Sequence, residues 1–265
     1  MLNIFTSTVK NPSKQFKEKK REKGEDNLQW LARVIKADDA KYTNVLLFGG
    51  SGLTAFRLRV AQSQLRHDFT PSSWSHAVLL GNLRRNIAST IIHEISLEPP
   101  SGFGFPVPAN GLQKSKLANY RDQEQYPNIA LITVPVDRKK VTAALVRYQR
   151  QRAVLDGPQL LLTWLAYMWG TGRASNPLLD GQGMPSAAMI EVVIGSSGFD
   201  LTPGLESRSS CPEAIWQAAR WWYEYYEKDK GKESLSGSFS NVHEFLKLKD
   251  EQDEEKLNAD KFARS

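Results

Sequence analysis

The stretch GQGMPSAAMIEVVIGSSGFDLTP, residues 181–203, decides the fold predicted for this chain. A loop that contains glycines and a proline leads directly into an apolar segment, 186–195, which we expect to form a buried helix. Ser186 stands at the junction of the loop and the helix. Its hydroxyl either caps the helix, as small polar residues commonly do, or occupies the position of a nucleophile.

Length and composition indicate one large domain with a substantial core, since 40% of the 265 residues are hydrophobic. The single cysteine, Cys211, excludes an intrachain disulfide and a zinc site built from several cysteines. No apolar run reaches the roughly 18–20 residues that a transmembrane helix needs. The first residues lack the pattern of a secretory signal. We therefore expect a cytoplasmic protein, or an effector that is exported without a signal peptide.

The net charge of +6 is compatible with an anionic partner such as a cell wall or a membrane. The positive charge is concentrated in KQFKEKKREK, residues 14–23, which belongs to a basic and polar extension over residues 1–40. One amphipathic helical segment is expected there, around Leu28 and Leu31. The sequence shows no zinc-finger, RNP-like or helix-turn-helix pattern, so no specific nucleic-acid partner is expected.

Between residues 41 and 228 the pattern predicts an α+β domain with an antiparallel sheet packed against helices. The expected strands are TNVLLFGG, SHAVLLG (75–81), STIIHEISL (89–97) and NIALITVPV, and the middle two form a hairpin. The expected helices cover 52–66, 139–155, 157–170, 186–195 and the segment that follows Cys211. Segment 157–170 is apolar on nearly all sides, which predicts a buried helix. A charged, partly flexible tail is expected over residues 229–265.

Two of the four histidines lie in the predicted hairpin. His76 opens the first strand and His93 lies inside the second. Because side chains alternate along a strand, His93 and its neighbour Glu94 face opposite sides of the sheet. Pairing of the two strands would bring His76 beside one of them, as a general base beside the residue that orients it.

The order of these segments resembles that of the circularly permuted papain-like superfamily. In that superfamily a first strand and helix are followed by a strand that carries the catalytic histidine, a strand that carries the third catalytic residue and, later, a helix that begins with the nucleophile. The corresponding segments here are NVLLFGGSGLTAFRLRVAQ, WSHAVLLG, IIHEISL and, after a long gap, PSAAMIEVVIGSSGFDLTP. This superfamily contains permuted NlpC-type cell-wall peptidases and amidases and the lecithin retinol acyltransferase-like enzymes. The resemblance covers roughly residues 43–225, and implies a papain-like fold with the nucleophile at the start of a late buried helix.

The resemblance also implies roles for individual residues. His76 is expected to be the base, His93 or Glu94 its orienter, and Ser186 to stand where the family has its catalytic cysteine. Cys211 then caps the following helix. The implied activity is hydrolysis of an amide or peptide bond, with a cell-wall peptide attacked by an antibacterial toxin as one case. A lipid acyltransferase or phospholipase, which acts on an acyl ester, is the alternative. Neither a metal nor an organic cofactor is implied.

Serine at position 186 departs from the family, whose nucleophile is a thiolate. Three interpretations are open: a cysteine-to-serine replacement that inactivates a thiol hydrolase, a natural serine nucleophile, and a pseudoenzyme that binds without cleaving.

A separate question concerns RWWYEYYEK, residues 220–228. Its helical spacing predicts packing against the sheet, and a membrane- or sugar-binding surface is the alternative.

Overall fold

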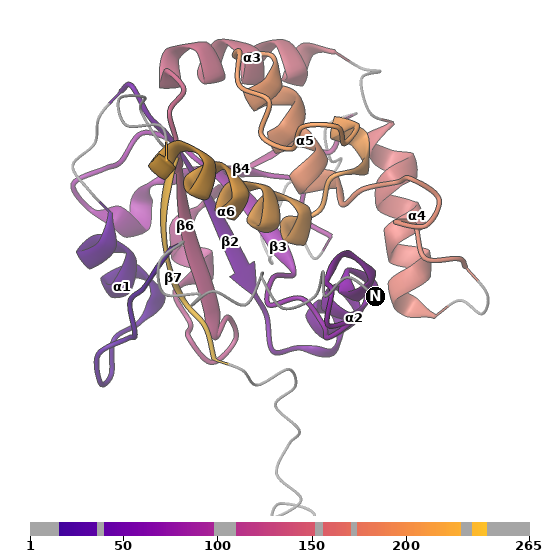
Figure 1. The fold of residues 1–265 in the computed structure, drawn as a ribbon, viewed down its shortest axis with the longest axis horizontal. Helices are drawn as coiled ribbons and strands as arrows, with labels where there is room; N and C mark the ends of the chain where they lie inside the picture. The colour runs from indigo at the N-terminus through magenta and orange to yellow at the C-terminus, as the bar shows by residue number, and fades with distance from the viewer. Residues whose placement is uncertain are drawn as a thin grey trace, which may run out of the picture.

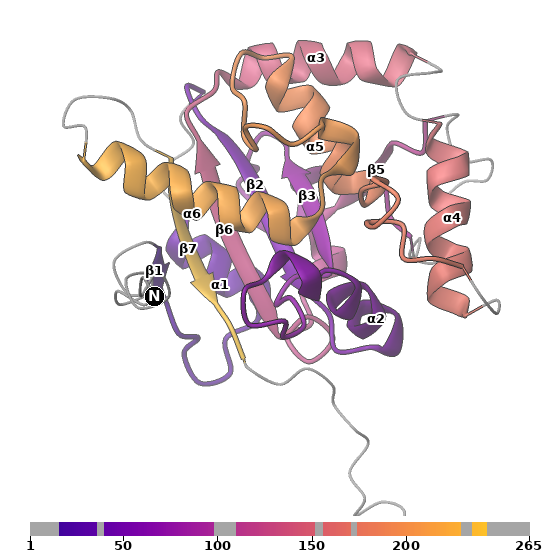
Figure 2. The same ribbon diagram turned by 45° about the vertical axis from the view of Figure 1, so that its right-hand side comes forward.

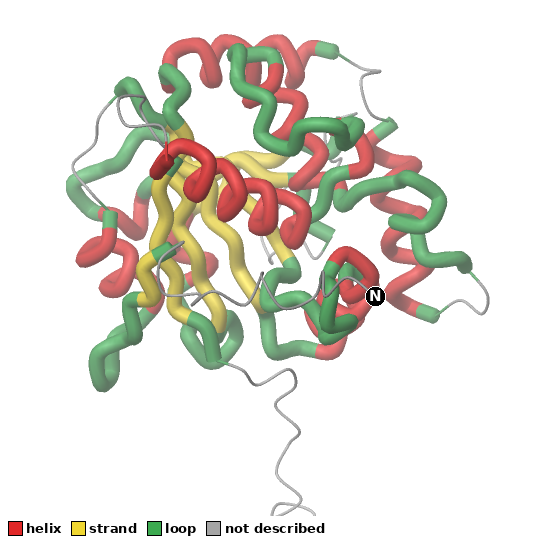
Figure 3. The backbone as a smooth tube through the Cα atoms, viewed as in Figure 1, coloured by secondary structure: helices red, strands yellow, loops and turns green. Residues whose placement is uncertain are grey.

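The structure is a computed structural model that describes residues 16–35, 40–97, 110–151, 156–170, 174–228 and 235–242 (Figure 1). Its centre is one mixed sheet, which Figure 3 shows in yellow between layers of red helices. The strands of the described residues follow one another across the sheet in the order β1 (Lys17–Glu18), β7 (Ser236–Ser240), β6 (Asn128–Val134), β2 (Thr43–Gly49), β3 (His76–Leu80), β4 (Ile91–Glu94) and β5 (Gln113–Lys116). Of these, β1 and β7 are parallel, and the other neighbours are antiparallel.

Helices cover both faces of the sheet. One face is covered by α1 (Asn27–Val34) and the short 3-10 helix η4 (Leu117–Tyr120). The other face is covered by the remaining α-helices, which Figures 1 and 2 show around the sheet: α2 (Leu53–Ala61), α3 (Arg138–Arg150), α4 (Gly157–Trp169), α5 (Pro185–Gly195) and α6 (Pro212–Lys228). Three further 3-10 turns lie in the connections: η2 (Ser63–Leu65), η3 (Ile87–Ser89) and η5 (Ser207–Ser209).

Strand alternation divides the core between these two layers. On β3, Ala77 and Leu79 pack with α5, whereas Val78 and Leu80 pack with α1. α5 is the most enclosed helix, since its residues from Pro185 to Ile194 are buried with the exception of Val192. The predicted α+β class, the β3–β4 hairpin and the buried helix after the glycine-rich loop are therefore confirmed. The prediction of an antiparallel sheet is wrong at one edge, where β1 pairs with β7 in parallel.

The predicted extension and tail are wrong as boundaries of the domain. α1 begins with a capping box at Asp26 and buries Trp30 completely. β7, which lies within the expected tail, pairs with β6 along its length. Phe16 lies against Gly237, so the first and last segments of the described residues pack on each other. The sequence up to residue 15 and beyond residue 242, including most of the expected charged tail, lies outside the described residues.

The prediction that segment 157–170 is buried on nearly all sides is also wrong. α4 buries only Gly157, Trp164 and Met168, and Leu162 and Trp169 are each 64% exposed. The physical reason is that α4 packs on α2 and α5, and only the side that carries Trp164 and Met168 is buried there. None of the described helices is both long enough and apolar enough to pass through a bilayer.

A chain that ends at residue 228 should be less stable than one that ends at residue 242, because it loses β7 and the fully buried Leu235. Burial of one leucine contributes about 1.5–3 kcal/mol, and β6 also loses a paired neighbour, so we expect the free energy of unfolding to fall by about 3 kcal/mol or more. Urea denaturation of the two chains, followed by tryptophan fluorescence, measures the difference. Equal midpoints would show that the domain is complete at residue 228.

α5 carries one buried acid, Glu191, which is 3% exposed. Burial raises the pKa of this carboxyl from its ordinary 4.5 to about 7, hydrogen bonds from Thr202 and Ser210 oppose the rise, and the charge of Asp200 adds to it. The folded state therefore holds the proton more tightly than the unfolded chain does. The resulting stability is present in acid and is lost as the pH rises through about 7.

Replacement Glu191→Gln should remove this part of the pH dependence. Between about pH 4.5 and pH 8 the native chain should lose about 3 kcal/mol of unfolding free energy relative to the glutamine variant. Urea denaturation at a series of pH values gives both profiles. Glu206→Gln, which alters an exposed carboxyl, is the matched control and should follow the native chain. If the unfolding free energies of the native chain and of Glu191→Gln changed with pH in the same way, the pH dependence would not come from Glu191.

Candidate active site

The structure brings two of the expected site residues together at the start of β3. His76 Nε2 lies 2.8 Å from Glu94 Oε2 on the neighbouring strand β4. Both side chains face the α1 side of the sheet, on the same side as Val78 and Ile92. The alternative between His93 and Glu94 is therefore resolved in favour of Glu94 as the partner of His76.

The carboxylate of Glu94 is fully buried and is held by several donors. Besides His76, the Ser115 hydroxyl of β5 donates to Oε1 and the Tyr120 hydroxyl donates to Oε2 over 2.5 Å. Burial alone would raise the pKa of Glu94, but these hydrogen bonds and the charge of His76 outweigh it and hold the pKa below its ordinary value. Glu94 is thus an ionised acceptor, which requires that His76 Nε2 carries a proton. The nitrogen of His76 that is able to take a proton is Nδ1.

Aromatic packing fixes the ring of His76. The ring lies nearly parallel to that of Tyr120, with centroids 5.9 Å apart, and Tyr120 in turn stacks on Phe48 at 4.3 Å. Beside the imidazole is a small hollow of about 50 Å³. Its walls come from α2, from the ends of β3 and β4, and from the two tyrosines: Thr54, Ala55, Leu58, Ser75, His76, Ser96, Leu97, Tyr120 and Tyr126. A base held in this way beside a hollow is suited to proton transfer.

His93 lies on the opposite face of β4, where it is paired in register with Leu79 and Lys114. Burial, with a contribution from the charge of Lys114, lowers the pKa of His93 to about 4. Its Nδ1 is buried without a hydrogen-bond partner in the described part of the chain. His93 is therefore a neutral residue of the sheet and does not orient His76.

Ser186 lies in the first turn of α5, after Pro185, and is 3% exposed. The N-cap position belongs to Met184, so the alternative in which Ser186 caps the helix is wrong. Its hydroxyl donates to the carbonyl oxygen of Ala77 over 2.5 Å and accepts from the amide of Ile95 at 3.3 Å. Ser186 thus contacts the backbone of the residue after His76 and of the residue after Glu94.

The strand register explains this position. β3 and β4 pair with Leu79 opposite His93, and the same register continued by two residues would place Ala77 opposite Ile95. In an antiparallel ladder these two residues would exchange a direct hydrogen bond. The hydroxyl of Ser186 stands between them instead and relays the bond from one strand to the other. The expected proton transfer from Ser186 to His76 is not set up in this geometry, because the one hydroxyl proton is donated to Ala77.

Cys211 is fully buried directly before α6, in agreement with a position at the start of that helix. Burial is the main cause that raises the pKa of its thiol to about 12. A thiol that stays protonated and has no access to solvent is a poor nucleophile. Cys211 is therefore a residue of the core.

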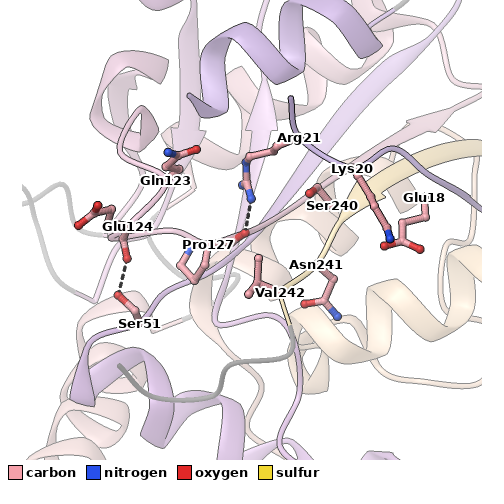
Figure 4. Close-up of a pocket in the computed structure, with 10 residues that line it drawn as sticks. All are labelled: Glu18, Lys20, Arg21, Ser51, Gln123, Glu124, Pro127, Ser240, Asn241 and Val242. Atoms are coloured by element: carbon pink, nitrogen blue, oxygen red, sulfur yellow. Dashed lines mark hydrogen bonds between the residues drawn. The ribbon is translucent and has the colours of Figure 1, made fainter. Parts of the chain in front are cut away.

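A larger cavity, which we call the polar groove, lies at the same end of the sheet (Figure 4). It has a volume of about 450 Å³ and is lined by Glu18, Lys20, Arg21, Ser51, Gln123, Glu124, Pro127, Ser240, Asn241 and Val242. Arg21 donates to the carbonyl of Pro127 over 2.6 Å, and the Ser51 hydroxyl donates to the carbonyl of Glu124 over 2.7 Å. The segment that carries Glu124 and Pro127 of the groove also carries Tyr126 of the hollow, so neighbouring residues of one segment line the two cavities.

Two residues of the site were missed from the sequence. Ser115 lies on β5, in the run QKSK, whose lysines are exposed while Gln113 and Ser115 are buried. That alternation is a signal of an edge strand and was available in the sequence. Tyr120 lies in a 3-10 turn, for which the sequence offers no comparable signal.

Of the expected site residues, His76 and Glu94 are in contact, Ser186 is held by the backbone next to both, and His93 points away from them. The described residues contain no cluster of histidine, cysteine and acidic side chains that is able to hold a metal ion. Comparisons of the chain with protein-family models, with curated proteins and with solved structures found no match.

Removal of the bridging hydroxyl should destabilise the fold. Ser186→Ala leaves the amide of Ile95 and the carbonyl of Ala77 buried without partners, so we expect the free energy of unfolding to fall by about 2–3 kcal/mol. Ser197→Ala removes a hydroxyl just after the C-terminal end of the same helix, where it donates to the carbonyl of Val193, and should cost less than about 0.5 kcal/mol. Urea denaturation compares the two variants. Equal small losses would show that the Ser186 bridge contributes nothing to stability.

Proposed function

We propose that this chain has the scaffold of a circularly permuted papain-like hydrolase. In this scaffold the catalytic base is in place, and the residue at the nucleophile position is catalytically inactive. In this proposal His76 is the base, Glu94 orients it, and Ser186 stands where a thiol would attack an amide, peptide or acyl-ester carbonyl. The chain binds such a group beside His76 and does not cleave it at an enzymatic rate.

The observation that carries the proposal is the bridge made by Ser186. The start of α5 reaches the point where β3 and β4 separate, and the hydroxyl bonds the residues that directly follow His76 and Glu94. This position supports the assignment of residue 186 to the nucleophile position. The same bonds support the proposal that Ser186 is catalytically inactive, because a hydroxyl that donates to Ala77 and accepts from Ile95 has no proton to give to the imidazole of His76.

A thiol at this position would behave differently. Sulfur is a weak hydrogen-bond donor and acceptor, so it has less to gain from the bridge between the strands. The start of a helix favours the thiolate, and in this proposal the imidazole of His76 would take the proton of the thiol. The thiolate would attack the carbonyl carbon, His76 would give the proton to the leaving amine or alcohol, and water would then hydrolyse the thioester.

The polar groove favours a peptide as the group that is bound. Its lining carries side chains of both charge signs, Glu18 and Glu124 with Lys20 and Arg21, together with serine and amide groups. These groups are able to bind the amides and charges of a peptide, and the apolar atoms that make up the larger part of the surface of the groove are able to contact its side chains. The alternative, a lipid acyl ester, is favoured by the apolar residues that α2 presents both to the hollow and to solvent.

A thiol-labelling experiment tests the proposal. Ser186→Cys treated with iodoacetamide and mapped by peptide mass spectrometry should be labelled at position 186 at least about tenfold faster than at Cys211 near pH 7, because the thiol of Cys211 stays protonated. The added change His76→Ala should abolish the difference. His93→Gln in the same background is the matched control, since His93 lies on the other face of the sheet, and should leave the labelling rate unchanged.

Hydrolysis of an activated ester by the native chain completes the test. The native chain should hydrolyse p-nitrophenyl acetate no faster than its His76→Ala variant does. A hydrolysis rate that depends on both His76 and Ser186 would show an active serine enzyme, and would overturn the proposal that Ser186 is catalytically inactive. Labelling of Ser186→Cys that is slow and indifferent to His76 would show that residue 186 is not a nucleophile position, and would overturn the papain-like assignment.

A further inference from the structure

Two helices on the outside of the molecule present apolar side chains to solvent. On α2, Leu53 is 58% exposed and Val60 is 38% exposed. On α4, Leu162 and Trp169 are both 64% exposed. The members of each pair are seven residues apart, which places them on one side of their helix. Each helix therefore carries an outward apolar stripe.

The two stripes meet through Arg57. This exposed residue lies between Leu53 and Val60 on α2, and its guanidinium donates to the carbonyl of Met168, the residue before Trp169. Figures 1 and 2 both show α2 beside α4. We call the surface formed by Leu53, Arg57, Val60, Leu162 and Trp169 the α2–α4 face.

The charges of this face have one sign. α4 has no charged residue, and α2 has arginines and no acid. At the other end of α4, Asp156 accepts from the amide of Gln159 and, with Asp180 and Glu206, lines a separate hollow. The net charge of the whole chain is +6, which adds long-range attraction for an anionic surface.

We propose that the α2–α4 face docks on the surface of a lipid bilayer that contains anionic headgroups. Leu162 and Trp169 enter the boundary between headgroups and acyl chains, where a leucine side chain and an amphipathic indole are favourable. Arg57 lies at the level of the lipid phosphates and pairs with them. The helices lie along the surface and do not cross it.

A second copy of this chain fits the same face less well. A symmetric dimer uses the same patch on both subunits, so it would bring Arg57 of each copy close to the other at the centre of an apolar contact. No acid on α2 or α4 is present to neutralise the pair. An anionic bilayer supplies the missing negative charge. This inference does not rest on the proposed function, although the inner side of α2 lines the hollow beside His76.

Vesicle sedimentation tests the proposal with the full chain. The native chain should bind vesicles of equal parts phosphatidylcholine and phosphatidylglycerol more tightly than vesicles of phosphatidylcholine alone, and salt should weaken the difference. The double variant Leu162→Ser/Trp169→Ser should lower the partition coefficient about tenfold or more on both kinds of vesicle. Arg57→Gln should reduce the preference for phosphatidylglycerol and leave binding to phosphatidylcholine unchanged.

The matched control is the double variant Val146→Ser/Trp221→Ser, which alters one exposed aliphatic and one exposed tryptophan on α3 and α6. It should change the partition coefficient by less than about twofold. An equal loss in both double variants would show that binding is not specific to the α2–α4 face. The proposal would be overturned if the native chain bound neither kind of vesicle. It would also be overturned if analytical ultracentrifugation showed a dimer that the Leu162→Ser/Trp169→Ser variant dissociates, because the α2–α4 face would then bind a second copy of the chain.

Discussion

One hydroxyl group holds the site together, because three elements meet at Ser186. The start of α5, the strand that carries His76 and the strand that carries Glu94 are joined by the relay from Ile95 through Ser186 to Ala77. A direct bond between the two strands would close the ladder and leave no place for the helix at the fork. The hydroxyl keeps the strands apart by one atom and satisfies both backbone groups, which a buried site requires. The Ser186 hydroxyl thus links the start of α5 to the backbone beside both members of the His76–Glu94 pair.

The His76–Glu94 pair is costly to bury and is made stable by the residues around it. A carboxylate with no exposure to water needs compensating donors, and Glu94 has them from β3, β5 and η4. The same donors keep it ionised, so the proton stays on Nε2 of His76 and the basic nitrogen is the other one. The electrostatics of the base are thus arranged by Ser115 of β5 and Tyr120 of η4, whose side chains reach Glu94 on the face of the sheet opposite α5.

Much of the domain centre was predictable from the sequence. The hairpin, the helix after the glycine-rich loop and the presence of His76 with one of two neighbours in the site follow from periodicity and turn residues. Alternation places His93 and Glu94 on opposite faces, but it cannot say toward which face His76 turns, since that depends on the pairing register. β7 was missed because SGSFS has the composition of a loop, and only the free edge of β6 makes it a strand. The exposure of α4 was missed because an apolar sequence does not state what covers it.

The parallel pair of β1 and β7 places the beginning and the end of the described chain next to each other in the sheet. Lys17 stands opposite Ser238, and Phe16 packs against both Trp216 and Tyr223 of α6. During synthesis β1 has no neighbour among the described strands until β7 has left the ribosome. Contacts of such large sequence separation form late and slow the search for the native state. The first edge of the sheet to be translated is therefore the last to be completed, and the nascent chain carries an unpaired β6 edge until then.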